Sequence, residues 1–302
     1  MDQYKVVAVI LNYKTWEETI ECVDSLLELN YENHQIVIVE NGSENDSYKR
    51  LHQNYSGNKV VHLIRSTKNQ GFAKGNNLGI RYARKKLGAD FVYVANSDTI
   101  ATNKNLYKEI TGAYKKGIGL ISPAVLQLDG EYQTPDINCD NIYKKAFISI
   151  ITVFFDYYFY TLVNWCKDFK QRKLQKPCIR YKENGVEIRL KKLAMYGCAF
   201  FLTPDFFDFY DSMYPKTFLY WEEINMIMYI EKAGLRSIVL KQTSIIHKAG
   251  KTVDSVFDNR THKKLKMSLQ SGINSITMFF MKQQTIKKRY SDMEHYNLKS
   301  EL

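Results

Sequence analysis

The chain has 302 residues, of which 45% are hydrophobic and 25% charged, so its composition excludes a disordered protein and allows one large folded domain with a small appendage. Its formal net charge of +11 fits an anionic partner, namely nucleic acid, an acidic membrane surface or a phosphorylated substrate. The 5 cysteines are widely spaced and include no Cys-x-x-Cys pair, which argues against a disulfide framework or a zinc site and indicates reduced thiols in a cytoplasmic protein. Because Asp2 is acidic and the apolar run after it is short, we expect no signal peptide.

The first half of the chain alternates predicted strands and helices. Continuous β-branched runs predict strands buried on both faces, and apolar residues at helical spacing predict helices between them. This order predicts an α/β fold with a mainly parallel, doubly wound sheet, in which ligands bind beyond the carboxyl ends of the strands. The expected strands are 5–11, 35–39, 60–64, 91–95 and 118–125, and the expected helices are 17–29, 76–87 and 103–116.

The region 140–192 interrupts this alternation. Within it, residues 146–166 carry a single charge, Asp156, and a basic run at 167–176 follows. Three interpretations stay open for this stretch: a helix pair in the core or in a homodimer, a helix lying on an anionic membrane, and a membrane span.

The rest of the chain returns to strands and helices. We expect a hairpin at 178–193, where polar and apolar residues alternate around Asn184-Gly185. We expect one domain over 1–258, with 140–192 as an insertion, and a helical segment over 259–302. The other expected elements are strands at 195–202, 237–240 and 244–247 and helices at 224–233 and 260–287.

Two acidic residues follow buried strands of the predicted sheet. Asp98 ends the sequence Asn96-Ser97-Asp98, and a carboxylate in that place can hold a divalent cation that bridges diphosphate oxygens. Glu40 lies one strand away and can accept hydrogen bonds from the base or sugar of a nucleotide. For both residues the alternative is a turn or helix-capping role, since Asn41-Gly42-Ser43 is strong turn chemistry.

A glycine-rich loop at 69–77 opens the next helix. Gly71 and Gly75 allow the backbone to approach a ligand closely, and a helix N-terminus favours an anion such as diphosphate. The loop matches neither the phosphate-binding P-loop nor the Gly-x-Gly-x-x-Gly pattern, so by itself it is a weak signal.

The second half of the chain contains an acidic pair and a histidine. Glu222 and Glu223 follow the aromatic run 218–221, and carboxylates in an apolar setting have raised pKa values, which suits a general base. The alternative is a solvated helix N-terminus, where the dipole favours acids. His247 ends an apolar strand and is either a metal or phosphate contact or a structural histidine.

The order and spacing of these features resemble glycosyltransferase family 2, especially its rhamnosyltransferase-like and galactofuranosyltransferase-like members. The most specific strings are NQGFAKGNNLGI at 69–80 and the later WEE of 221–223 followed by His247. The resemblance covers most of 5–125 and 195–252, which together are over half of the chain, and implies a GT-A, Rossmann-like fold. The matching segments within these two regions are 6–27, 36–43, 69–83, 92–99, 196–207, 218–236 and 244–252.

The resemblance also implies roles for individual residues. Asp98 and His247 would hold Mg²⁺ or Mn²⁺, and Glu223 would be the catalytic base, with Glu222 beside it. Trp221 and Asn225 would contact the acceptor. The residues implied in binding the nucleoside-diphosphate-sugar donor are Asn12, Glu40, Asn41, Gly71, Asn76, Asn96 and Ser97.

This sequence departs from the family pattern at several of these positions. Only the last carboxylate of the Asp-x-Asp-like metal motif is present, as Asp98, and glutamates replace aspartates at 222 and 223. Asn225 and Tyr229 stand where the family has an aspartate and often an arginine, and that region contacts the acceptor.

The reaction that we expect is an inverting transfer from a UDP- or dTDP-sugar to a glycan or lipid-linked oligosaccharide of a bacterial surface polysaccharide, at the inner face of the cell membrane. The main alternative is a nucleotide-sugar-binding protein without turnover, which the reduced metal motif favours. A nucleotidyltransferase would need a glycine-rich basic loop after the first strand, where this chain has Asn12-Tyr13-Lys14-Thr15. We expect no nucleic-acid partner, since no known reader motif accompanies the basic charge.

Overall fold

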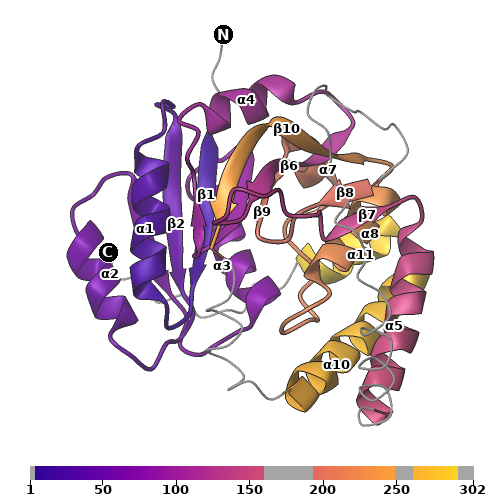
Figure 1. The fold of residues 1–302 in the computed structure, drawn as a ribbon. Helices are drawn as coiled ribbons and strands as arrows, with labels where there is room; N and C mark the ends of the chain where they lie inside the picture. The colour runs from indigo at the N-terminus through magenta and orange to yellow at the C-terminus, as the bar shows by residue number, and fades with distance from the viewer. Residues whose placement is uncertain (1–3, 160–192, 249–260, 292–302) are drawn as a thin grey trace.

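The computed structural model describes residues 4–159, 193–248 and 261–291, and an eight-stranded sheet runs through their centre (Figure 1). Its strands are β1 Val6–Asn12, β2 His34–Glu40, β3 Val61–Arg65, β4 Phe91–Asn96, β5 Thr99–Ile100, β6 Ile118–Leu126, β9 Ala199–Leu202 and β10 Arg236–His247. They lie in the order β3-β2-β1-β4-β9-β6-β10-β5. Two further strands, β7 Ile137–Cys139 and β8 Leu193–Met195, form a separate antiparallel pair.

The sheet is mostly parallel, which confirms the predicted α/β class, but two strands are reversed. β9 lies antiparallel between β4 and β6, and the short β5 lies antiparallel to β10. The expected single strand 195–202 is wrong, because it is divided into β8 and β9. The division falls at Gly197, whose N–H donates to the side chain of Asp136 at 2.7 Å instead of joining the sheet.

Helices cover both faces of the sheet. The expected first helices are present, and α3 begins four residues earlier than predicted, directly after Gly71, whose φ of 78° turns the chain into the helix. The single helix expected over 260–287 is wrong, since the chain forms two helices there. The helices are α1 Trp16–Leu27, α2 Ser47–Tyr55, α3 Phe72–Lys85, α4 Leu106–Ala113, α5 Ile142–Tyr158, α7 Pro204–Phe209, α8 Glu222–Lys232, α10 Thr261–Phe280 and α11 Gln283–Ser291.

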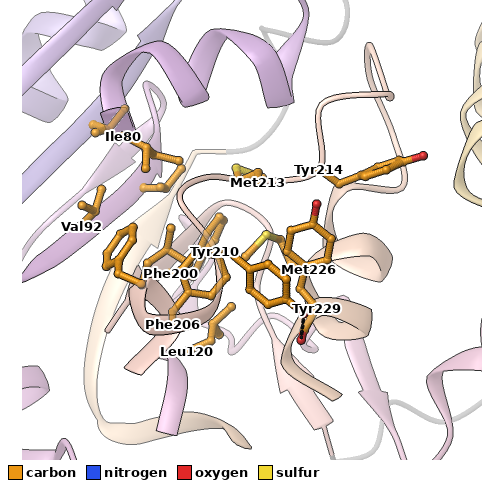
Figure 2. Packing of buried hydrophobic residues seen from close by; sticks show 14 of the residues in the cluster. Ile80, Val92, Leu120, Phe200, Phe206, Tyr210, Met213, Tyr214, Met226 and Tyr229 are labelled. Carbon is orange, nitrogen blue, oxygen red and sulfur yellow. Dashed lines mark hydrogen bonds between the residues drawn. The ribbon is translucent and has the colours of Figure 1, made fainter. Parts of the chain in front are cut away.

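Buried apolar side chains form a core on each side of the sheet. Along β1, Val7 and Val9 belong to one core and Ala8 and Ile10 to the other, as the two-residue period of a strand requires. Figure 2 shows the first core where α7 and α8 cover the sheet. There the Tyr210 and Tyr229 rings stack with centroids 4.2 Å apart, and the Tyr210 hydroxyl donates to the Tyr229 carbonyl. This packing fixes α8, which carries the predicted catalytic pair.

Helices α5 and α10 form an antiparallel pair beside the sheet (Figure 1). Tyr143 contacts Phe279 at one end of the pair, and Tyr157 stacks on His262 at the other. Only Ile142 and Ala146 of α5 are buried. Of the helices in the described residues, none is long and apolar enough to cross a membrane. The hairpin expected at 178–193 lies almost wholly outside the described residues.

Candidate active site

The carboxyl ends of three parallel strands meet at one edge of the sheet. Asn12 pairs with Glu40 in the register of β1 with β2, and Leu11 pairs with Asn96 in the register of β1 with β4. The loops that follow are joined by hydrogen bonds: Lys14 N–H donates to Ser43 Oγ at 3.0 Å, and a further bond links the hydroxyls of Thr15 and Ser97. The polar residues that the sequence places after these strands are therefore neighbours in the fold.

Glu40 is fully buried in the turn after β2. One of its oxygens accepts from the Ser43 N–H at 2.6 Å and the other from Arg65 Nε at 3.2 Å. Both carboxylate oxygens therefore have partners within the chain, as the turn interpretation requires. The predicted contact with a nucleoside stays a prediction.

Asn41 fastens the glycine-rich loop to the sheet edge. Its Nδ2 donates to Asn69 Oδ1 and to the Gly71 carbonyl, and its Oδ1 accepts from the Gln70 N–H. Asn12 and Asn76 differ from it, since each is buried and has one side-chain atom without a hydrogen-bond partner in the described residues, Nδ2 and Oδ1 respectively. Asn41 thus has a bracing role here, and the other two have polar atoms to offer a ligand.

A backbone contact fixes the glycine loop against the segment before α8. The Phe72 N–H donates to the Phe218 carbonyl at 2.7 Å, and a Cβ on Gly71 would lie 2.3 Å from that same oxygen. The donor-side loop and the segment that leads to Glu222 and Glu223 are therefore held as one unit.

Replacing Gly71 by alanine is expected to destabilise the protein by at least about 2 kcal/mol, since the positive φ alone costs about 1 kcal/mol and the backbone clash adds to it. Gly57→Ala is the matched control, because Gly57 has a φ of 85° and nothing within 4 Å of its Cβ position. Urea unfolding of both variants measures the difference. Equal losses of stability would contradict the inferred contact with Phe218.

Asp98 and His247 lie together at the carboxyl edge of the sheet. His247 Nε2 is 3.3 Å from Asp98 Oδ1, and both side chains are largely buried. Strand pairing causes this proximity, because β10 and β5 align His247 with Thr99, and the Lys248 N–H donates to the Asp98 carbonyl. The structure thus brings together two residues that are 149 positions apart in the sequence.

The chemistry of this pair fits a divalent cation. Asp98 Oδ1 is buried and has no hydrogen-bond partner among the described residues. His247 Nδ1 lies 3.2 Å from Gln133 Oε1, and a ring that donates there from Nδ1 alone would present its Nε2 lone pair to Asp98. In that tautomer a cation between Nε2 and the Asp98 carboxylate would satisfy both groups. Among the described residues no group of three or more His, Cys, Asp or Glu side chains could hold a metal.

The two acids begin helix α8 after a strained turn. Tyr220 and Trp221 both have positive φ, 71° and 76°, which is rare for large side chains and costs of order 1 kcal/mol or more each. Burial raises the pKa of Glu222 well above its usual value, with a further contribution from Glu223. Burial, and then the charge of Asp136, raises the pKa of Glu223 to about 7, which suits a general base.

Three acids, Asp136, Asp98 and Glu223, lie near the Cys198 thiol. Burial raises its pKa well above the usual value, and the negative charges of Asp136, Asp98 and Glu223 each raise it further. Because β9 is antiparallel to β4, its first residues lie at the carboxyl end of β4, and the Asn96 N–H donates to the Cys198 carbonyl. The predicted base and the predicted metal ligand therefore lie around the same short segment.

The predicted acceptor residues are both buried. Trp221 is 5% exposed, its Nε1 donates to Ser268 Oγ, and its ring fills the space above Gly272 on α10. Asn225 is 1% exposed, and neither polar atom of its side chain has a hydrogen-bond partner among the described residues. Of the aromatic run, Phe218 is the more exposed, at 39%. Their roles toward an acceptor stay predictions.

The chain is similar to known glycosyltransferases. Residues 7–136, less than half of the chain, match Glycosyl transferase family 2. Over this segment the chain resembles that family. It is 31% identical over 132 residues to the low-salt glycan biosynthesis hexosyltransferase Agl10 of Haloferax volcanii, and 24% identical over 108 residues to the glycosyltransferase GlyG of Streptococcus pneumoniae. These matches cover 42% and 35% of this chain, and only 40% and 35% of the lengths of the two relatives.

Solved structures show that the chain has a GT-A-like fold, as expected. The mannosyltransferase PcManGT of Pyrobaculum calidifontis, in complex with GDP-Man and Mn²⁺, aligns over 91% of this chain and 70% of its own, with a TM-score of 0.52 and 9% identity. GalNAc-T7 with UDP, GalNAc and Mn²⁺ aligns over 83% of this chain and 44% of its own, with a TM-score of 0.57 and 14% identity.

Sequence reasoning missed two residues of this region. Gln133 and Asp136 lie in the loop before β7, where they contact His247 and Gly197. Neither lies next to a recognisable strand end or glycine loop, so their residue types gave no signal. Only the pairing of distant segments reveals them.

Proposed function

We propose that this protein is an inverting glycosyltransferase that moves a sugar from a UDP- or dTDP-sugar to a hydroxyl of a glycan or lipid-linked oligosaccharide. The observation that carries the proposal is the placement of a partly buried acid with a pKa of about 7, Glu223, and of the Asp98–His247 pair around Cys198. The named activities of Agl10 and GlyG, and the nucleotide sugars bound by the structural neighbours, support the same reaction class.

The chemistry assigned to the chain is a single displacement. Glu223 takes the proton from the acceptor hydroxyl, and the oxygen forms a bond to the anomeric carbon of the donor. The bond from that carbon to the diphosphate breaks on the opposite side, so the configuration inverts. Mg²⁺ or Mn²⁺, held by Asp98 and His247, would neutralise the charge that develops on the departing diphosphate. Asn12 and Asn76 place unpaired polar atoms at the donor side.

A donor screen tests the proposal. Purified protein is incubated with Mn²⁺ and a panel of UDP-, dTDP- and GDP-sugars, and nucleotide release is measured with and without EDTA. We expect metal-dependent release from one UDP- or dTDP-sugar. Equal release in EDTA, or no release from any donor that binds, would contradict it.

The second candidate function is nucleotide-sugar binding without turnover. It is favoured by the single carboxylate in Asn96-Ser97-Asp98 and by the lack of a third His, Cys, Asp or Glu ligand in the described part of the chain. Calorimetry that follows the donor-bound protein over hours separates the two functions. A binding protein retains the donor intact and gives no heat of hydrolysis, whereas a transferase hydrolyses the donor slowly even without acceptor and gives that heat.

A lipid-linked acceptor fits the surface of the α5–α10 pair. Large apolar side chains of α5 are exposed along its outer side, and the first turns of α10 at the same end of the pair carry lysines. Aromatic and basic residues together favour the interface of an anionic membrane. The apolar residues are Phe147, Ile148, Ile151, Phe154, Phe155, Tyr158 and Phe159, and the lysines are Lys263, Lys264 and Lys266.

In a vesicle sedimentation assay, we expect the protein to bind vesicles that contain phosphatidylglycerol and not vesicles of phosphatidylcholine alone. The double substitution Phe154→Ser and Phe155→Ser is expected to weaken binding about tenfold or more, because each side chain is about half exposed and its insertion contributes about 1–2 kcal/mol. Leu128→Ser is the control, since Leu128 is 70% exposed and lies in the segment after β6, outside both helices of the pair. Equal binding by the double variant and the control would exclude this surface as the membrane contact.

A further inference from the structure

Asp136 is held firmly in the loop that precedes β7. Its Oδ2 accepts from the Gly197 N–H at 2.7 Å, and its backbone carbonyl accepts from Lys145 Nζ at 2.9 Å. The side chain and the main chain of this exposed acid are thus both anchored, one to the segment between β8 and β9 and the other to α5.

Gly197 also packs against the side chain of Glu223. A Cβ on Gly197 would lie 2.1 Å from Glu223 Oε1 and 2.8 Å from its carboxyl carbon, so the Glu223 carboxylate occupies the space of the missing side chain. The Gly197 nitrogen, whose hydrogen is donated to Asp136, is bonded to the Gly197 Cα, which faces Glu223. The carboxylates of Asp136 and Glu223 are therefore close neighbours, joined through Gly197.

The titratable groups around Glu223 lie in the loop before β7, on α5, on α8 and in the Gly197 segment. After burial, the negative charge of Asp136 is the largest cause that raises the pKa of Glu223, while the Lys145 ammonium on α5 lowers it. Burial raises the pKa of Glu222, beside it on α8, and that of Cys198, on the Gly197 segment, well above their usual values, which favours the uncharged form of both. Asp136 is therefore the main charged group acting to hold a proton on Glu223.

We propose that Asp136 is a positioning residue for the proton acceptor, which holds Gly197 beneath the Glu223 carboxylate and faces that carboxylate with its own charge. This inference rests on the proposed function of Glu223. Asp136 makes Glu223 a stronger base than it would be alone, and its hydrogen bond keeps the Gly197 segment in register with the site.

The test uses Asp136→Asn, in which the amide oxygen still accepts from the Gly197 N–H but the charge is gone. We expect the acid limb of the pH–rate profile to move to lower pH by on the order of one unit. We expect the same movement in a donor-free ¹³C NMR titration of labelled glutamate carboxyls, with the Glu223 signal assigned from its loss in Glu223→Gln. Asp140→Asn is the matched control, because Asp140 is an exposed acid four residues further along the same segment.

The two measurements distinguish the failure of this inference from that of the proposed function. A Glu223 titration that is the same in Asp136→Asn and Asp140→Asn overturns the role of Asp136, whatever the activity. A shifted titration supports it even if no donor is turned over. Asp136→Ala, which loses the hydrogen bond as well, is expected to lower kcat further than Asp136→Asn, and equal kcat values would overturn the anchoring part of the role.

Discussion

Glu223→Gln is expected to lower the rate of sugar transfer by about 10²–10⁴-fold, which is the usual contribution of a positioned general base. Glutamine keeps the shape of the side chain but cannot take a proton from the acceptor hydroxyl. The native enzyme should show a pH–rate profile that rises through about pH 7 as Glu223 ionises, and the variant's residual rate should lose that rise. Steady-state kinetics between pH 5 and 9 check both outcomes.

The same substitution is expected to stabilise the protein at alkaline pH. The folded-state pKa of Glu223, about 7, lies above its unfolded value of 4.5, so the native state binds the extra proton and loses stability as pH rises from 4.5 through 7. The loss at pH 8 is at most about 3 kcal/mol, and glutamine removes it. Glu32→Gln, at an exposed acid outside the site, is the control. A Tm difference between Glu223→Gln and native protein that does not grow from pH 5 to pH 8 would contradict the raised pKa.

Asp98→Asn is expected to abolish metal-dependent transfer, with a loss of at least about 10²-fold in kcat. The substitution leaves an oxygen in place but removes the negative charge that balances the cation and orients it with His247. Binding of Mn²⁺ in the presence of UDP, followed by electron paramagnetic resonance, should weaken by at least about tenfold.

Two variants make this result specific. His247→Ala is expected to reproduce the loss of Mn²⁺ binding, because His247 Nε2 faces Asp98 Oδ1. Asp46→Asn changes the charge equally at an exposed position before α2 and should leave binding intact. Full activity of Asp98→Asn in EDTA would show that catalysis does not require a cation at this pair.

The sequence predicted the first half of the sheet well because local signals coincide there. β-branched runs identify β1, β2 and β4, and the polar residues after them include Glu40 and Asp98. Because these strands are parallel, their carboxyl ends lie at the same edge of the sheet, and the residues that follow them become neighbours. For His247, its place at the end of an apolar strand left a metal or phosphate contact and a structural role open, and only the family resemblance favoured the metal.

The acceptor side was predicted less well. An apolar run such as 195–202 does not reveal its direction in a sheet, so the antiparallel placement of β9 was not expected. The family resemblance gave Trp221 a role toward the acceptor, and its ring is buried against Gly272 of α10, so that role stays a prediction. Asp136 is an exposed loop acid, and its bond to a residue 61 positions away is visible only in three dimensions.

The position of β9 has a consequence for how the chain can be divided. β4 is hydrogen-bonded to β1 on one side and to β9 on the other, and β9 is made of residues 199–202. A fragment that ends at residue 136, where the family match ends, would leave one edge of β4 bare and β6 without its link to it. Bare strand edges template aggregation, so shortened versions of this protein should retain the chain through β9. During synthesis the sheet stays open until more than a hundred further residues have followed β4.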